Sequence, residues 1–123
     1  MKPIVAAVWV AACLFVGPGC KQNAPPLTPG APTGPAVGMA GESLNFVVVT
    51  TDPESDSVRY QVDWGDALGN WTGLLASAES CTLGHAWSVL DAFKVRVRAE
   101  DAHGNVSDWS ADHTVSIESI CRR

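Results

Sequence analysis

The sequence predicts an all-β domain of the two-layer sandwich or barrel class, and three observations lead there. Beyond the first twenty residues, short runs alternate apolar and polar residues, which is the period of strands with one packed face and one wet face. Turn-forming residues separate these runs at the spacing of a sandwich or barrel. The 3.6-residue period of an amphipathic helix is missing from the same region.

Six segments carry the strand pattern. In chain order the expected strands cover residues 43–50, 58–64, 70–75, 80–87, 92–100 and 113–119. The run at 92–100 is the clearest, because four apolar residues alternate with four charged ones: Phe93, Val95, Val97 and Ala99 against Lys94, Arg96, Arg98 and Glu100. Residues 31–42 are expected to supply a further edge strand, where proline is tolerated.

The first nineteen residues are expected to form a signal helix that is not part of the domain. Lys2 precedes an uncharged apolar run at residues 4–16, which has signal-peptide length and is short for a bilayer span. The following "GPGC" resembles a bacterial lipoprotein signal, in which the cysteine after a small residue is cleaved and acylated. The family usually has Leu where this chain has Gly17. The resemblance implies a lipid anchor on Cys20, and ordinary secretion is the alternative.

Residues 20–38 are rich in proline and glycine and nearly free of charge. This composition predicts a semi-extended tether that buries little surface. The β-sandwich domain is therefore expected to cover residues 39–120.

Charge narrows the class of partner. The formal net charge is −5, and the basic residues are scattered and do not interleave with aromatics. Nucleic acid is therefore an unsuitable partner, and the acidic balance indicates solubility.

Three motifs in order resemble the PKD-type (polycystic kidney disease) immunoglobulin-like domain, close kin to fibronectin type III. They are "WGD" at 64–66, "HAW" at 85–87, and the valine-rich strand through Val97 followed by "DAHG" at 101–104. The resemblance covers about residues 32–119. It implies an immunoglobulin-like sandwich of about seven strands, with structural roles for Trp64, Asp66, His85 and Trp87. Ala67 stands where the family commonly has Gly.

The topology that the resemblance implies predicts which strands pair and how far apart the cysteines lie. Antiparallel pairing of 58–64 with 92–100 is expected to place Arg59 opposite Glu100, Gln61 opposite Arg98 and Asp63 opposite Arg96. Cys81 and Cys121 should lie at opposite poles, too far apart for a disulfide. Cys81 is then a buried thiol, while Cys13 leaves with the leader.

An acidic loop is the main candidate for a metal site. Alternate carboxylates in "TDPESDS" share a pole with the loop at 101–108, so oxygens from both loops could bind Ca²⁺. The candidate ligands are Asp52, Glu54, Asp56, Asp101 and Asp108. The alternative is a solvated turn, since the glycine and terminal glutamate of an EF-hand are missing.

No catalytic set stands out, so we expect no enzyme. Asp63 and Asp66 flank a turn, where Asp66 is expected to satisfy backbone N–H groups. The histidines fall on different elements, and His85 is expected in the core. Exposed Trp71 and Trp109 could stack on sugar rings, the alternative being core packing.

The sequence therefore predicts a non-enzymatic lipoprotein that displays a sandwich module for protein or glycan contact. The alternative is a carbohydrate-binding accessory domain that uses Trp71 and Trp109. The expected location is the bacterial cell envelope, on the outer membrane or cell surface, through the lipid on Cys20. Secretion is the alternative location. No cofactor is expected apart from calcium.

Overall fold

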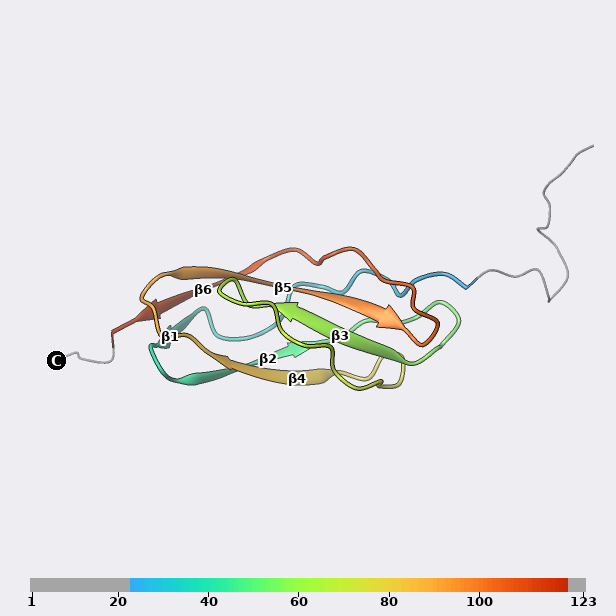
Figure 1. The fold of residues 1–123 in the computed structure, drawn as a ribbon, viewed down its shortest axis with the longest axis horizontal. Helices are drawn as coiled ribbons and strands as arrows, with labels where there is room; N and C mark the ends of the chain where they lie inside the picture. The colour runs from blue at the N-terminus through green and yellow to red at the C-terminus, as the bar shows by residue number, and fades with distance from the viewer. Residues whose placement is uncertain (1–22, 120–123) are drawn as a thin grey trace, which may run out of the picture.

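The computed structural model describes residues 23–119, which form an elongated all-β sandwich (Figure 1). The chain enters at one end of the long axis and leaves at the other. The expected signal helix, Cys13, Cys20 and Cys121 lie outside the described residues. Within residues 23–119, no helix is long and apolar enough to cross a membrane. The all-β sandwich predicted from the strand pattern is confirmed.

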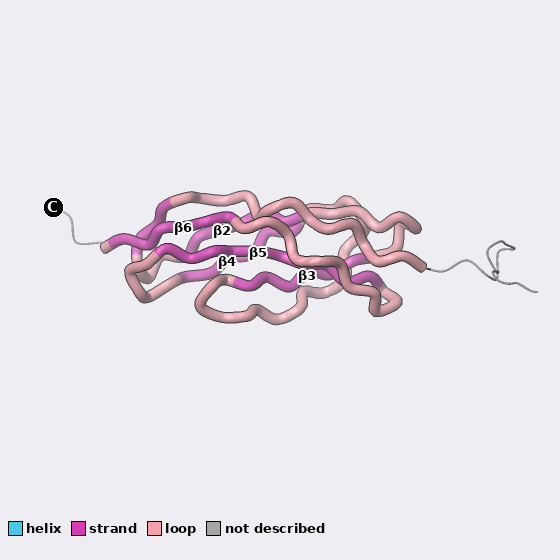
Figure 2. The backbone as a smooth tube through the Cα atoms, turned by 90° about the horizontal axis from the view of Figure 1, so that it is seen from above, coloured by secondary structure: helices cyan, strands magenta, loops and turns pink. Residues whose placement is uncertain are grey.

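One layer is an antiparallel pair, β2 (Ser43–Val48) and β4 (Cys81–Ala86). The other has the order β1 (Val37–Met39), β6 (His113–Glu118), β5 (Ala92–Asp101) and β3 (Val58–Asp63). The pair β1–β6 is parallel and the other pairs are antiparallel. Figure 2 shows that loops connect the long strands at the two ends of the sandwich.

The β3–β5 register matches the expectation from charge. Arg59 pairs with Glu100, Gln61 with Arg98 and Asp63 with Arg96. This register also turns Tyr60 and Ala99 together into the core, where both are fully buried. Burial on one face and charge complementarity on the other therefore select the same pairing.

The core lies between the two layers and is aromatic at its centre. Phe46 and Trp87 meet edge to face at 6.0 Å, and both are buried. The Trp87 indole N–H donates to the Trp64 carbonyl at 3.1 Å, so this buried donor is satisfied. Tyr60 is also buried; its hydroxyl accepts the Thr50 N–H at 2.9 Å, and burial raises its pKa. The predicted core roles of Trp64 and Trp87 are confirmed.

Residues 27–33 lie along the edge of β2 and the residues that follow it. Pro26, Pro29 and Pro32 are buried, and this spacing of three matches the period of a polyproline II helix. Leu27 N–H donates to the Thr51 carbonyl at 3.0 Å, and Thr33 exchanges two backbone bonds with Val47. The sequence predicted a tether through residue 38, but the packed domain begins by residue 26. A repeat of three residues per turn places these prolines on one face of the segment, and that face is the one that packs against the domain.

The expected edge strand is confirmed but divides between the layers. Thr33 bridges to Val47 of β2, whereas β1 pairs with β6 in the other sheet. The edge therefore belongs to both layers, first to β2 and then to β6.

The strand expected at residues 70–75 is absent from the described chain, which has six strands rather than about seven. Leu75 and Leu68 each form an isolated bridge with β3. Between these two bridges, the Thr72 hydroxyl oxygen accepts a hydrogen bond from the Tyr60 N–H at 3.0 Å. A side chain has replaced a backbone partner there, which interrupts the ladder.

Candidate functional site

The acidic pole is the end of the sandwich where the chain enters, and we define it by Asp52, Glu54, Asp56 and Asp101. Three of these side chains lie in the loop between β2 and β3, and Asp101 ends β5. Figure 1 shows both loops at the end where residue 23 begins. The structure therefore brings together four of the five carboxylates predicted from the sequence. Asp108 is exposed. In the described residues it is not among the side chains close enough together to share a metal ion.

Asp52 organises its own loop. Its Oδ2 accepts the N–H groups of Glu54 at 2.9 Å and Asp56 at 3.1 Å. The Ser55 N–H donates to the Asp52 carbonyl at 2.9 Å, and Ser55 takes the left-handed conformation with φ 62°. The loop therefore wraps around the Asp52 carboxylate and turns the alternate carboxylates toward one side.

Three carboxylate oxygens at this pole are buried without a hydrogen-bond donor. They are Asp52 Oδ1, Glu54 Oε1 and Asp56 Oδ2. One oxygen from each side chain lies within 4.8 Å of the other two. The Asp52 residue is only 4% exposed. A buried acceptor without a partner costs about 1–3 kcal/mol, and more when it is charged. The loop at residues 52–56 therefore leaves three buried carboxylate oxygens without a hydrogen bond.

Asp101 differs because hydrogen bonds surround it. Its Oδ1 accepts the N–H groups of His103 at 2.8 Å and Asn105 at 3.0 Å. Its Oδ2 accepts the side-chain amides of Asn23 at 2.5 Å and Asn105 at 3.2 Å. Burial raises the pKa of Asp101, but the bonds from Asn105, His103 and Asn23 outweigh burial and lower the pKa below its ordinary value. Asp101 therefore fastens the chain entry to the β5–β6 loop.

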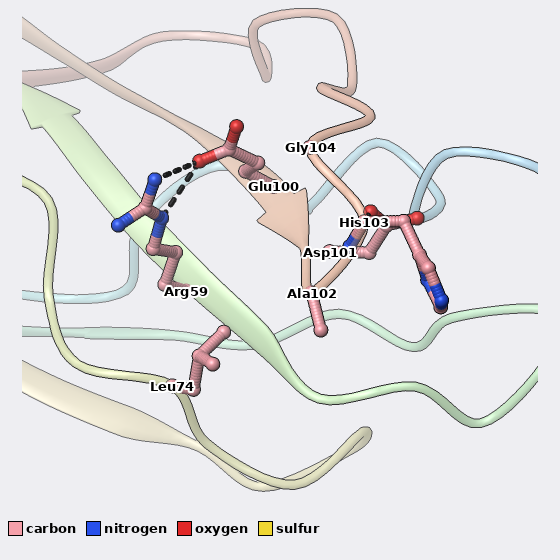
Figure 3. Close-up of a pocket in the computed structure, with 7 residues that line it drawn as sticks. All are labelled: Arg59, Leu74, Glu100, Asp101, Ala102, His103 and Gly104. Carbon is pink, nitrogen blue, oxygen red and sulfur yellow. Dashed lines mark hydrogen bonds and ion pairs between the residues drawn. The ribbon is translucent and has the colours of Figure 1, made fainter.

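A shallow pocket of about 400 Å³ lies beside this pole. Figure 3 shows Arg59 on one wall reaching across to Glu100, with a guanidinium–carboxylate distance of 2.5 Å. The opposite wall is the turn from Ala102 to Gly104. His103 Nδ1 lies 3.2 Å from Asp56 Oδ2, which places its imidazole next to the acidic loop.

The outer face of β3 and β5 carries a stack of alternating guanidinium and indole groups, which we call the Arg–Trp ladder. Its order is Arg59, Trp71, Arg98, Trp109, Arg96. Guanidinium-to-ring distances run from 4.5 Å, for Arg96 over Trp109, to 5.4 Å, for Arg98 over Trp71. Each indole is thus contacted by two cations, within the range of cation–π attraction.

The histidine of the "HAW" motif lies between aromatic rings and an acid. His85 stacks on Trp64 at 4.8 Å and meets the edge of Trp87 at 4.6 Å. Its Nε2 lies 2.9 Å from Asp66 Oδ1. The expectation that Asp66 caps its own turn is wrong, because Asp63 Oδ1 accepts the Gly65 N–H at 3.0 Å. Asp66 is directed across to β4, a contact that sequence spacing does not show.

Cys81 packs at the edge of the core and is half-buried, so it is less buried than its place in the strand pattern predicts. Burial, and then the charge of Glu79, raises the pKa of its thiol. It forms no disulfide within the described residues. The predicted lack of a bridge to Cys121 stays a prediction, since Cys121 lies outside them.

No protein-family model matches the chain, and no curated protein matches it. Among solved structures, it is similar to the PKD domain of an M14-like peptidase from Thermoplasmatales archaeon SCGC AB-540-F20. That match has 34% identity and a TM-score of 0.73, and it covers 80% of this chain and 100% of the archaeal one.

Two more distant solved structures are also similar to this chain. The CARDB domain of a Pyrococcus furiosus protein, solved in complex with di-metal ions, has 15% identity and a TM-score of 0.54, covering 79% of this chain and 96% of its own. The PKD domain of the human VPS10 domain-containing receptor SorCS2 has 19% identity and a TM-score of 0.49, covering 92% and 97%. The archaeal match spans that whole domain at more than 30% identity, so this chain belongs to the PKD domain family.

Proposed function

We propose that this protein is a non-enzymatic module held at a bacterial membrane surface by a lipid on Cys20, and that it presents its far end to a protein partner. The observation that carries the proposal is where the packed chain begins. Asn23 already bonds to Asp101, only three residues after Cys20. Three residue steps reach at most about 11 Å. A lipid on Cys20 therefore holds the acidic pole close to the membrane and directs the sandwich outward.

The outward end carries exposed apolar side chains, and we call it the distal pole, defined by Val37, Val89 and Leu90. These residues are 54%, 60% and 56% exposed. Val37 and Ala92 both pair with Ser116, so β1 and the start of β5 flank β6 at one level. Apolar groups gathered on an outward surface support protein contact. Immunoglobulin-like sandwiches also present their loops at their two ends.

The anchor is tested by cell fractionation and mass spectrometry. Wild type should sediment with membranes and carry acyl groups on an N-terminal Cys20. Cys20→Ser should appear in the soluble fraction, while the matched control Cys81→Ser should stay with the membrane. A soluble wild-type protein without acyl mass would contradict the anchor and favour secretion.

The contact surface is tested by photocrosslinking in intact cells. A photoreactive residue at Leu90 should give one discrete protein adduct. The matched position is Leu68, which is 58% exposed but lies beyond the end of β3. Equal adducts from both positions, or none from Leu90, would contradict a distal contact surface.

Carbohydrate binding through Trp71 and Trp109 is the competing function. The Arg–Trp ladder weighs against it, because a sugar needs an indole face and each indole already contacts two guanidinium groups. We therefore expect no glycan-array signal from wild type. A signal that Trp71→Ala abolishes would instead favour the glycan function.

A further inference from the structure

The three oxygens without donors need a positive partner, and the basic residues of the described chain are elsewhere. Within residues 23–119 the Lys and Arg side chains all project from β3 and β5: Arg59, Lys94, Arg96 and Arg98. Arg59 pairs with Glu100 and Arg96 with Asp63. His103 approaches Asp56, but its side chain is 60% exposed and it reaches only this one carboxylate of the three. Three carboxylates at this spacing repel one another when all are ionised.

We propose that a Ca²⁺ ion binds between Asp52 Oδ1, Glu54 Oε1 and Asp56 Oδ2. Carboxylate oxygens are hard ligands, which suits Ca²⁺ and Mg²⁺ better than zinc. Ca²⁺ accepts irregular geometry and completes its six to eight ligands with second carboxylate oxygens or water, whereas Mg²⁺ demands a regular octahedron. Asp101 is not a ligand, because both of its oxygens already accept hydrogen bonds. Asp108 is excluded by its position.

The ion acts on the chain entry. Glu54 offers Oε1 to the ion while its Oε2 accepts the Ala24 N–H at 3.4 Å. Glu54 thus links the ion to the first described residues, close to Cys20. Ca²⁺ also takes the oxygen that faces His103, so the imidazole must leave Asp56 when the ion binds. The inference does not depend on the proposed anchor or on a protein partner.

The experiment measures the melting temperature of the full-length chain in detergent, first with chelator and then with about 1 mM Ca²⁺, a concentration that fills extracellular calcium modules. Wild type should melt about 5 °C higher with Ca²⁺. Mg²⁺ at the same concentration should give less than half of this shift. No shift with either ion would overturn the proposal.

Two substitutions test the ligands, and a third matches their charge change. Asp56→Asn and Glu54→Gln should each lose most of the calcium shift, whereas Asp108→Asn should keep it. In chelator, Asp56→Asn should melt at or above wild type, because it removes repulsion. A variant that loses the calcium shift but melts no lower than wild type in chelator has lost a ligand. A damaged fold would melt lower than wild type under both conditions. An undiminished calcium shift in both ligand variants, or a loss of the shift in Asp108→Asn, would overturn the assignment.

A titration followed by NMR locates the ion. The His103 imidazole signals should move with added Ca²⁺. His85, beside Asp66, and His113, beside the Pro35 carbonyl, should stay unchanged. Movement of His85 or His113 without His103 would place the ion elsewhere and overturn the site.

Discussion

The Arg–Trp ladder and the acidic pole both concentrate charge, yet they differ in how that charge is satisfied. In the ladder, Arg59 and Arg96 have carboxylate partners, and Gln61 Oε1 accepts two bonds from Arg98. In the loop at residues 52–56, three buried oxygens have no donor. A charged group whose partners are built in stabilises the fold, whereas one whose partners are missing needs a ligand. This difference is why we expect the ladder to contribute to stability and propose the loop as the ion site.

Removing an indole from the ladder should have the largest effect. Trp109→Ala takes away a half-buried ring and two cation–π contacts, so we expect a loss of about 3 kcal/mol in the free energy of unfolding. Chemical denaturation measures it. A double-mutant cycle with Arg98→Met should give a coupling of about 1 kcal/mol. A coupling near zero would mean that the Arg98 guanidinium and the Trp109 ring lie side by side without stabilising each other.

Asp101 is the carboxylate of the acidic pole whose two oxygens both accept hydrogen bonds. Substituting it measures what those bonds contribute to stability. Asp101→Asn turns an acceptor that faces the amides of Asn23 and Asn105 into a donor, so we expect a loss of about 2 kcal/mol. Denaturation in chelator measures it beside Asp56→Asn, which should lose nothing. Similar losses in the two variants would remove the distinction between a hydrogen-bonded carboxylate and one without donors.

Acid should weaken the fold partly through Asp101. Its pKa in the folded chain lies below the ordinary value of 3.8, so the stability it contributes is present above that value and is lost as the pH falls through the folded pKa. Between about pH 5 and about pH 3, wild type should lose more unfolding free energy than Asp101→Asn, by roughly 1 kcal/mol. Equal pH profiles would contradict the lowered pKa.

The pair of Arg96 with Asp63 should have the smallest effect. Its Nε–Oδ2 distance is 3.2 Å, and the two side chains are 41% and 28% exposed. Either single charge reversal should cost about 0.5 kcal/mol, and the double reversal should recover most of it. A double reversal that adds both losses would show that Trp109, rather than Asp63, holds Arg96 in place.

The sequence was most informative where two constraints coincide. The β3–β5 register could be predicted because apolar alternation fixed the faces and opposite charges fixed the offset. The pairing of Asp66 with His85 joins the turn after β3 to β4 across nineteen residues, so local sequence patterns predict a role for Asp66 in its own turn instead. The distinction between Asp101 and Asp56 depends on burial and on amides from residue 23, which composition does not reveal.

The packing of the proline-rich segment could not be predicted from the sequence for a different physical reason. Its low charge and high proline content are typical of spacers, and strand and helix periods do not appear in it. The interval of three between Pro26, Pro29 and Pro32 was present in the sequence. It becomes a packing signal only when a polyproline helix has a sheet edge to lie against.

The parallel pairing of β1 with β6 has a mechanical consequence. The described chain begins at one end of the long axis and finishes at the other, and both strands run the same way along it (Figure 1). A pull applied between residues 23 and 119 slides β1 against β6, so their hydrogen bonds are loaded together in shear rather than opened one after another. The β1–β6 register, Val37 with Ser116, Gly38 with Ile117 and Met39 with Glu118, is therefore one place where the fold resists tension along its long axis.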